Sequence, residues 1–253
     1  MRRLAGFALV LIACAGCGTG ANEHFTIQSR LVGHSLEQAV FVPSGDTHGR
    51  PLLVLLHGRS SSPDSMAKKS ITNAIGKLGS RAPVVVFANG GNHSYYHDRA
   101  DGRWGSYIMR EVIPAAVRKY DLDKRRIAIG GFSMGGFGAL DLARFRRFCA
   151  VGAHSAAMWR TGGETPQGAF DDAEDFEQND IIEAATANPR LYGSARVWID
   201  IGTNDPFRNA NEELARRLAG ESFHLWRGDH DFSHFERDAP KVMRFYADAL
   251  ERC

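Results

Sequence analysis

The sequence has no long hydrophobic run, few cysteines and no excess of charge of one sign. Its apolar stretch from Leu4 to Ala15 is too short to span a bilayer as a helix. The 31 Lys and Arg residues nearly balance the 29 Asp and Glu residues, and the basic residues are mostly scattered. This excludes the basic stripe of a nucleic-acid-binding surface, so we expect no nucleic-acid partner. At 253 residues and 43% hydrophobic content, the chain is long enough for one well-buried α/β domain.

The amino-terminal residues have the pattern of an export signal. Met1 to Arg3 is a short basic segment, and the apolar run follows it directly. Leu11 to Gly18 resembles a bacterial lipoprotein cleavage box, which predicts lipidation of Cys17, with Cys14 as the alternative. We expect residues 1–17 to be a signal peptide, 18–23 a linker and 24–253 the folded domain. The protein is then exported to the cell envelope and anchored to a membrane by lipid, or else cleaved and secreted.

Only Cys149 and Cys253 remain after such a signal peptide. In an oxidising compartment they could form a disulfide. Cys149 opens an apolar segment that is typical of a buried strand, and free cysteine is itself among the most buried residue types. We therefore expect a buried free thiol at Cys149, with the disulfide as the alternative.

Strand-length apolar runs alternate with helical segments along most of the chain. Two segments with alternating apolar residues, 24–32 and 36–43, predict antiparallel edge strands. Continuous apolar runs predict strands covered on both faces at 51–56, 83–88, 126–130, 149–153 and 195–201. Helices are expected near 64–78, 104–120, 134–145, 209–218 and 236–250. This alternation predicts a three-layer α/β/α sandwich with a mostly parallel central sheet.

Residues 157–189 do not fit the regular alternation. They contain Gly162-Gly163 and an acidic run from Asp171 to Asp175, with few strong apolar periods. An excursion between two strands would lie over the carboxyl edge of the sheet, where open α/β folds bind ligands. We expect the acidic run itself to be a solvated surface.

The run Gly131-Phe132-Ser133-Met134-Gly135 predicts a nucleophilic serine. It joins an apolar strand to a small-residue helix start, and such an elbow holds its central serine at positive φ. The turn closes only if the residues two before and two after the serine have almost no side chain, and Gly131 and Gly135 meet that demand. The backbone N–H of Met134 would then face the oxyanion that forms when Ser133 attacks a carbonyl.

A serine of this kind needs an imidazole base that a carboxylate orients, in the chain order Ser, Asp, His. Asp205 follows the strand that ends near residue 201, and His230 follows a short strand at 223–226. We therefore predict Ser133, Asp205 and His230 as a catalytic triad. Asp200 is the rival acid, but it lies inside its strand, where its side chain would point into a helix layer. His234 is the alternative base.

The second oxyanion donor should come from the loop that begins His57-Gly58-Arg59. Gly58 lets the backbone turn back toward Ser133, which makes the amide of Arg59 the predicted donor. The Arg59 side chain either meets an anionic group of the substrate or faces solvent, and the sequence leaves both open.

The segment from His93 to Asp98 could be misread as a metal site. Zinc ligands spaced by four need a helix, and the neighbouring glycines favour a loop, so we expect neither a metal nor a cofactor. We expect aromatic side chains to wall an acyl or aryl pocket, although ordinary packing explains them equally well. These residues are Tyr95, Tyr96, Trp104 and Trp159.

With these motifs the sequence resembles the "putative esterase" family of α/β-hydrolases, which includes esterase D, feruloyl esterase domains and the antigen 85 mycolyltransferases. The resemblance covers the chain from about Pro51 to its end. Its most specific parts are the runs 107–114, 131–140 and 228–232. It implies the α/β-hydrolase fold, the same triad and the same oxyanion amides. Phe232 and Phe235 stand where many relatives have Trp, which leaves the substrate open.

These observations predict an exported serine carboxylic-ester hydrolase that acts through an acyl-Ser133 intermediate. Its substrate would be a small-molecule, glycan or lipid ester. The alternatives are an acyltransferase that moves the acyl group to a sugar or lipid alcohol, and a surface binding protein that keeps the hydrolase fold without turnover.

Overall fold

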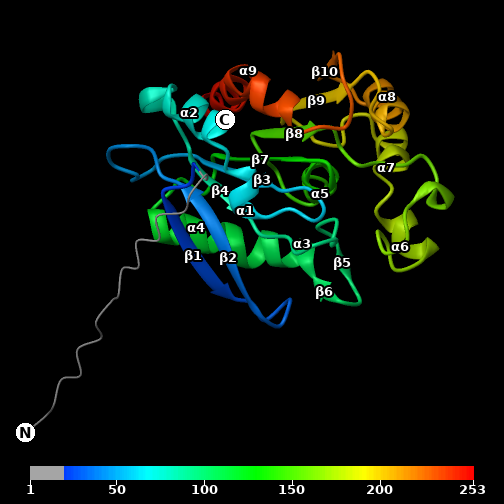
Figure 1. The fold of residues 1–253 in the computed structure, drawn as a ribbon, viewed down its shortest axis with the longest axis horizontal. Coiled ribbons are helices and arrows are strands. Elements are labelled where there is room, and N and C mark those ends of the chain that lie inside the picture. Colours follow the sequence, from blue (N-terminus) through cyan, green and yellow to red (C-terminus); the bar gives the residue numbers. More distant parts are fainter. Residues whose placement is uncertain (1–19) are drawn as a thin grey trace, which may run out of the picture.

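A computed structural model of the chain describes residues 20–253 and contains one large β-sheet (Figure 1). In space the strand order is β1-β2-β4-β3-β7-β8-β9-β10. The bounds are β1 Glu23–Gln28, β2 Ser35–Phe41, β3 Leu52–Leu56, β4 Val84–Ala88, β7 Ile127–Phe132, β8 Ala150–His154, β9 Arg196–Gly202 and β10 Glu221–Trp226. β2 is antiparallel to both β1 and β4, and the other neighbouring pairs are parallel. The mostly parallel sheet with an antiparallel amino-terminal edge is therefore confirmed.

Helices cover both faces of the sheet, which makes the three layers predicted from the sequence (Figure 1). Their bounds are α1 Pro63–Met66, α2 Lys69–Gly76, α3 Trp104–Tyr107, α4 Ile113–Tyr120, α5 Met134–Leu142, α6 Ala173–Gln178, α7 Ile181–Ala187, α8 Arg208–Arg217 and α9 Ser233–Glu251. α2 and α9 pack on one face, and α3, α4, α5 and α8 pack on the other. Along β3, Leu52, Val54 and Leu56 enter one core and Leu53 and Leu55 enter the other, because successive side chains of a strand point to opposite faces.

Two of the predicted helices are not regular. The helix expected at 64–78 is interrupted at Lys68, whose extended backbone (ψ 146°) separates α1 from α2. In the segment 104–120, a π-helical stretch, Ile108–Val112, joins α3 to α4. Pro114 follows it and has no N–H to donate to the carbonyl of Arg110, which accounts for the widened turn.

The excursion at 157–189 carries a short 3₁₀ turn, Gly162–Glu164, followed by α6 and α7. It extends beyond α5 at one end of the molecule, beside the small hairpin β5 Asp98–Arg99 and β6 Gly102–Arg103 (Figure 1). Its acidic run is mostly exposed, as predicted, but two of its carboxylates also pair with groups of the hairpin segment. Asp171 forms an ion pair with Arg99, and Asp175 contacts the buried ring of His97 at 3.0 Å. These carboxylates attach the excursion to the hairpin.

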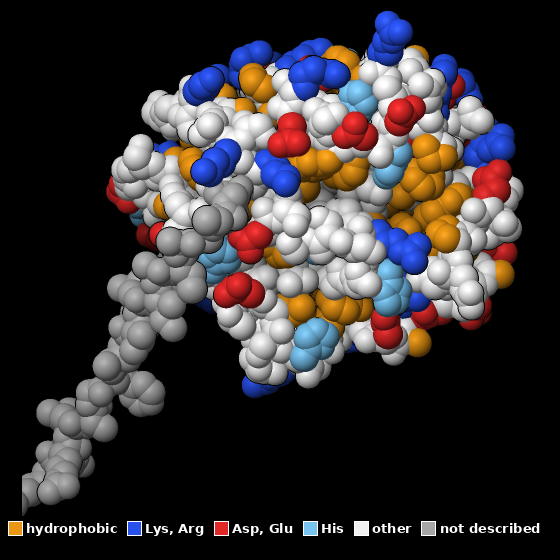
Figure 2. Space-filling view, viewed as in Figure 1, with side chains coloured by type: hydrophobic (Ala, Val, Ile, Leu, Met, Phe, Trp, Pro, Cys, Tyr) orange, Lys and Arg blue, Asp and Glu red, His pale blue; other side chains and the backbone are white. Residues whose placement is uncertain are grey.

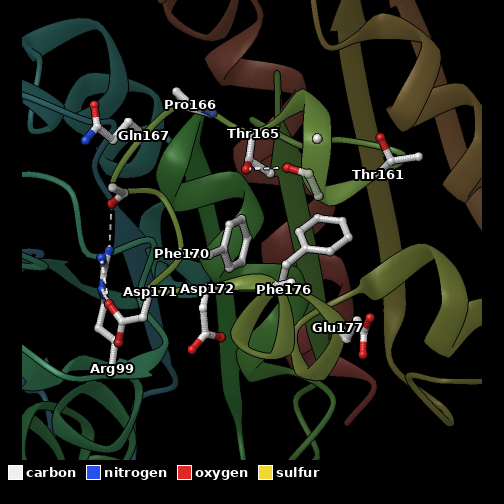
Figure 3. A pocket seen from close by; sticks show the side chains of 14 residues that line it. Arg99, Thr161, Thr165, Pro166, Gln167, Phe170, Asp171, Asp172, Phe176 and Glu177 are labelled. Atoms are coloured by element: carbon white, nitrogen blue, oxygen red, sulfur yellow. Dashed lines mark hydrogen bonds and ion pairs between the residues drawn. The ribbon is translucent and has the colours of Figure 1, made fainter.

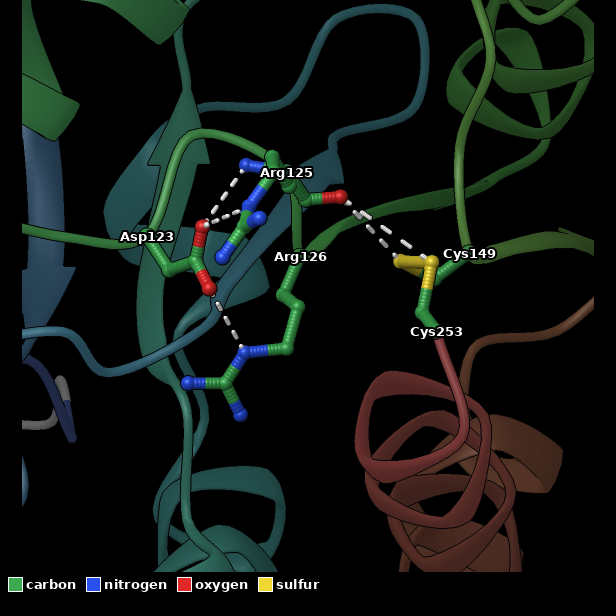
Figure 4. Close-up of a disulfide and its surroundings, with 5 residues drawn as sticks. All are labelled: Asp123, Arg125, Arg126, Cys149 and Cys253. Atoms are coloured by element: carbon green, nitrogen blue, oxygen red, sulfur yellow. Dashed lines mark hydrogen bonds and ion pairs between the residues drawn. A yellow bond between two sulfur atoms is a disulfide. The ribbon is translucent and has the colours of Figure 1, made fainter.

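Cys149 and Cys253 form a disulfide, so the prediction of a free thiol at Cys149 is wrong (Figure 4). α9 starts at the carboxyl edge of the sheet and packs along β7 and β8 toward their amino ends. The end of the chain therefore reaches the residue just before β8, and the two Cα atoms lie 5.6 Å apart. No local pattern around Cys149 could show this, because its partner is 104 residues away in sequence.

We predict that Cys253→Ser lowers the free energy of unfolding by about 2–4 kcal/mol, because the disulfide restricts a long loop of the unfolded chain. Urea unfolding without reductant measures this loss. Wild-type protein in excess dithiothreitol serves as the control and should match the variant. A wild-type unfolding curve that reductant leaves unchanged would show that the two sulfurs are not bonded.

Asp141 of α5 is buried, and its carboxylate lies 2.8 Å from Arg144. Burial raises the pKa of this carboxyl to about 6 despite the arginine. Since the folded pKa exceeds the ordinary value near 3.8, the folded state binds more protons than the unfolded chain between about pH 4 and 6. The contribution of Asp141 to stability therefore falls as the pH rises through this window.

We predict that Asp141→Asn abolishes this pH dependence. The free energy of unfolding of the variant, taken relative to wild type, should therefore rise from about pH 4 to about pH 6 and stay constant above pH 6. Urea unfolding at several pH values measures it. Glu164→Gln is the control with the opposite sign, because the backbone N–H of Arg160 lowers the pKa of Glu164, and its contribution to stability therefore rises with pH instead of falling. Parallel curves for Asp141→Asn and wild type would refute the prediction.

Charges of both signs are interspersed on the face of the molecule in Figure 2. Within residues 20–253, no helix has the length and apolar character needed to cross a membrane.

Candidate active site

Ser133 lies at the sharp turn between β7 and α5, and its backbone is strained. Its φ is 56° with ψ −117°, the positive φ predicted for an elbow serine. A Cβ added to Gly131 would lie 2.3 Å from the carbonyl oxygen of Gly135, and one added to Gly135 would lie 2.0 Å from that of Leu56. Both glycines are therefore required by close backbone approach, as the sequence indicated. The Ser133 N–H donates to the carbonyl of His154 at 3.0 Å, which ties the elbow to β8.

His230 and Asp205 lie on the loops that follow β10 and β9, so all three side chains meet at the carboxyl edge of the sheet. His230 Nε2 is 2.9 Å from Ser133 Oγ, and His230 Nδ1 is 2.8 Å from Asp205 Oδ2. Asp205 is buried, and its other oxygen accepts the N–H of Phe207 at 2.9 Å. A carboxylate can only accept, so Nδ1 carries the proton and Nε2 is free to accept from the serine hydroxyl.

Two phenylalanines hold the His230 ring. Phe132 stacks on it with ring centroids 5.2 Å apart, and Phe207 meets it edge to face at 5.0 Å. Sequence reasoning missed both, although Phe132 is part of the elbow motif and Phe207 stands two residues after Asp205. These contacts leave the imidazole one orientation, with its Nε2 toward Ser133.

The loop after β3 passes directly beside Ser133. A Cβ on Gly58 would lie 3.5 Å from the Cβ of Ser133, so the following amide, that of Arg59, is next to the serine. His57 is buried and fixes this loop. Its Nδ1 donates to the Gly58 carbonyl at 2.8 Å, and its Nε2 accepts the N–H of Gly90 at 3.2 Å. Burial lowers the pKa of His57, which keeps the ring neutral and able to make both bonds.

A cavity of about 330 Å³ opens at Ser133 and His230. Its walls combine apolar side chains, two serine hydroxyls and two cations. The remaining lining residues are Gly58, Arg59, Ser61, Ser65, Met66, Lys68, Phe132 and Phe232. The interruption between α1 and α2 places Lys68 in this wall, which no pattern in the sequence indicated.

The four aromatic residues predicted to wall a pocket separate into two pairs. Trp159 lies 5.5 Å from Phe207 in an edge-to-face contact, and Tyr95 lies 5.5 Å from Trp159. This pair therefore belongs to a packed cluster of aromatic rings that begins at His230, and Tyr95 is buried in it. Neither residue lines the cavity at Ser133.

Tyr96 and Trp104 do not face substrate, which corrects the prediction. Tyr96 is fully buried against Gly138 of α5, and its hydroxyl donates to the His57 carbonyl at 3.0 Å. Trp104 packs against His34 and donates its indole N–H to Asp101 at 3.2 Å. Both are packing residues, the reading that the sequence left open beside the pocket.

The two alternative triad members lie elsewhere. His234 is buried beneath Gly228, and neither of its ring nitrogens has a hydrogen-bond partner within residues 20–253. Asp200 points into the α9 layer as expected, and it belongs to a buried network that sequence reasoning missed. It accepts from His154 Nδ1 at 2.5 Å and from Trp198 Nε1 at 2.6 Å, while His154 Nε2 contacts the Tyr246 hydroxyl at 3.0 Å.

The histidines at 93 and 97 are not brought together on a metal-binding face. His97 is buried and stacks on Phe170 with ring centroids 5.0 Å apart, whereas His93 is half-exposed. In the part of the chain that the structure describes, no cluster of three or more His, Cys, Asp or Glu residues could hold a metal ion. The lipidation candidates Cys14 and Cys17 lie outside the described residues.

A larger cavity of about 810 Å³ lies in the excursion, with Phe170 and Phe176 side by side in its wall (Figure 3). Arg99 reaches the carbonyl of Gly168 at 2.9 Å and the carboxylate of Asp171, which closes one side. The lining of this cavity includes neither Ser133 nor His230. The serine therefore belongs to the smaller cavity.

Comparisons with known proteins agree with this geometry. A family model described as "Putative esterase" matches residues 29–245. Esterase Rv1288 of Mycobacterium tuberculosis is 29% identical over 238 residues, which cover 78% of this chain and 50% of that protein. The chain thus spans about half the length of that relative.

Two solved structures are similar over most of the chain. A ferulic acid esterase matches with a TM-score of 0.78 at 21% identity, covering 90% of this chain and 97% of that one. FphF, a fluorophosphonate-binding serine hydrolase of Staphylococcus aureus, matches with a TM-score of 0.73 at 20% identity, covering 89% and 97%. These likenesses show that the chain has the α/β-hydrolase fold.

Proposed function

Because the chain belongs to the "Putative esterase" family of α/β-hydrolases, we propose that it is an exported serine hydrolase of carboxylic esters. Ser133 is the nucleophile, His230 the general base and acid, and Asp205 the carboxylate that orients the imidazole. The hydrogen-bonded chain from Asp205 through His230 to Ser133 is the observation that carries this proposal. The substrate class is a small-molecule ester.

The reaction proceeds through an acyl-serine. Ser133 Oγ attacks the ester carbonyl while His230 Nε2 takes its proton, and the C–O bond to the alcohol breaks as the imidazolium returns that proton to the leaving alcohol. Water then attacks the acyl-serine with His230 again as base, which releases the acid and restores the hydroxyl. Asp205 orients and stabilises the imidazolium in both steps.

Two backbone amides stabilise the oxyanion of each tetrahedral intermediate. Met134 opens α5, so its N–H belongs to the first turn, where no preceding helical carbonyl accepts it. The amide of Arg59 lies next to Ser133 on the loop that His57 holds. Such donors are aligned before the reaction, which is why they lower the barrier more than water does.

Fluorophosphonate labelling tests the nucleophile. The proposal expects one adduct per chain, located on the peptide that contains Ser133, and none in Ser133→Ala. Ester hydrolysis by the same preparation then separates an enzyme from a binding protein. If the wild type is neither labelled nor able to hydrolyse esters, the proposal that the protein is an enzyme is refuted. Transfer of the acyl group to added sugars in preference to water would identify an acyltransferase instead.

Export is proposed from the amino-terminal signal pattern, and the Cys149–Cys253 disulfide supports it, because structural disulfides persist in oxidising compartments. Labelling with radioactive palmitate tests the lipid anchor. Loss of palmitate incorporation in Cys17→Ser supports anchoring at Cys17. Loss of incorporation only in Cys14→Ser would identify Cys14 as the lipidated residue instead. A wild type that stays unlabelled and appears in the medium would show release instead.

A further inference from the structure

The cavity at Ser133 has cations in its wall and no carboxylate. Arg59 and Lys68 both line it, and Asp and Glu are absent from the lining, which lies wholly within the described residues. Met66, Phe132 and Phe232 supply apolar surface between the charges and the serine. The cavity therefore has a formal charge of about +2 when His230 is neutral.

Neither cation is neutralised by a neighbour. Within residues 20–253, no carboxylate oxygen lies close enough to the Arg59 guanidinium or the Lys68 ammonium to form an ion pair. The Arg59 guanidinium lies near the phenol of Tyr95. Burial raises the pKa of this phenol against the influence of the cation, so it is a neutral neighbour that does not cancel the charge. Lys68 is exposed at the interruption between α1 and α2.

We propose that the substrate is an ester carrying a carboxylate or phosphate group, which Arg59 and Lys68 bind while Ser133 attacks the ester carbonyl. This inference rests on the proposed ester hydrolysis and names the class of ester.

The physical basis is the focusing of charge by a cleft. A concave wall with charge of one sign and apolar neighbours raises the local concentration of an oppositely charged ligand. A guanidinium presents two parallel N–H donors that match a carboxylate or phosphate, and an ammonium adds a compact charge beside it. A neutral ester of the same shape gains neither contact.

Two matched pairs of esters test the proposal and show which part of the substrate is charged. Mono-4-nitrophenyl glutarate carries its carboxylate on the acyl side, and its methyl ester is the neutral partner. 4-Acetoxybenzoate carries the carboxylate on the alcohol side, and methyl 4-acetoxybenzoate is its partner. In at least one pair we expect kcat/KM to be about tenfold higher for the anion than for the neutral ester at low salt. The ratio should decrease as ionic strength rises, because salt screens partly exposed charges.

Three variants assign the preference to the cavity. Arg59→Gln keeps the backbone amide and should lower the anion-to-neutral ratio about threefold, as should Lys68→Gln. Lys68→Glu should reduce it further, because the new carboxylate repels the anion. Lys69→Gln is the matched control. Lys69 is the adjacent lysine and does not line the cavity, so its removal should keep the wild-type ratio within about twofold.

The possible outcomes distinguish failure of this inference from failure of the proposed ester hydrolysis on which it rests. Hydrolysis of neutral and anionic esters at equal kcat/KM in both pairs would overturn the charged-substrate inference, but it would still support the proposed esterase function. An anionic preference that Arg59→Gln and Lys68→Gln both leave unchanged would also overturn it. Hydrolysis of no ester in either pair, with no fluorophosphonate adduct, would overturn the proposed function and this inference with it.

Discussion

Ser133→Ala is expected to lower kcat for ester hydrolysis by at least about 10⁴-fold, because the acyl-enzyme cannot form without the hydroxyl. The remaining rate comes from the oxyanion amides and from substrate binding alone. Steady-state hydrolysis of 4-nitrophenyl acetate measures the loss, and circular dichroism verifies the fold. Ser70→Ala is the matched control, because that hydroxyl is exposed and bonds Glu236 away from the cavity.

The double variant Ser133→Ala/His230→Ala should be scarcely slower than either single variant, because residues that act as one unit lose their contribution together. If the fold losses of kcat in the two single variants multiply in the double variant, Ser133 and His230 do not act as one catalytic unit. A Ser133→Ala protein that keeps more than about 1% of wild-type kcat would place the nucleophile elsewhere.

Asp200→Ala is expected to lower the free energy of unfolding by about 3–5 kcal/mol, because it removes one partner of a buried polar pair. The substitution leaves His154 Nδ1 and Trp198 Nε1 buried without an acceptor. Urea unfolding measures the loss. Tyr246→Phe is a milder variant that removes only the hydroxyl next to His154, and it should cost about 1 kcal/mol.

A pair of conservative variants separates this network from the active site. Asp205→Asn should lower kcat by about 10⁴-fold with little change in stability, because an amide no longer holds the imidazole in the required tautomer. Asp200→Asn should lower the stability and keep far more of the kcat. The reverse pattern would make Asp200 the acid of the triad and would overturn the assignment of Asp205.

The sequence located the strands and most helices within a few residues. Continuous apolar runs identify strands that are covered on both faces, and each appears in the sheet at or beside its predicted bounds. The break at Lys68 and the π-helical turn before Pro114 were missed. Apolar residues spaced by three to four positions predict a helix, but this spacing does not indicate where the helix is interrupted or where a turn is widened.

Aromatic residues were the least predictable part of the site. Tyr95 and Tyr96 are adjacent in sequence and both are buried, yet Tyr95 packs in the aromatic cluster with Trp159 and Tyr96 packs against α5. Neighbouring residues in a loop share composition but not direction, and direction depends on what packs above them. The same applies to His234, which follows His230 by four residues and packs beneath Gly228 instead of facing Ser133.

What could be read from the sequence alone was short-range chemistry: the Gly131-Ser133-Gly135 turn, its positive φ, and the order Ser, Asp, His along strand ends. These follow from sterics within a few residues and from the common direction of parallel strands. Packing between separate elements decided the Cys149–Cys253 disulfide, the Asp200–His154 pair and the placement of Lys68 and Arg59 in one cavity wall. No local pattern relates these residues, because each arrangement depends on where separate elements pack against the sheet.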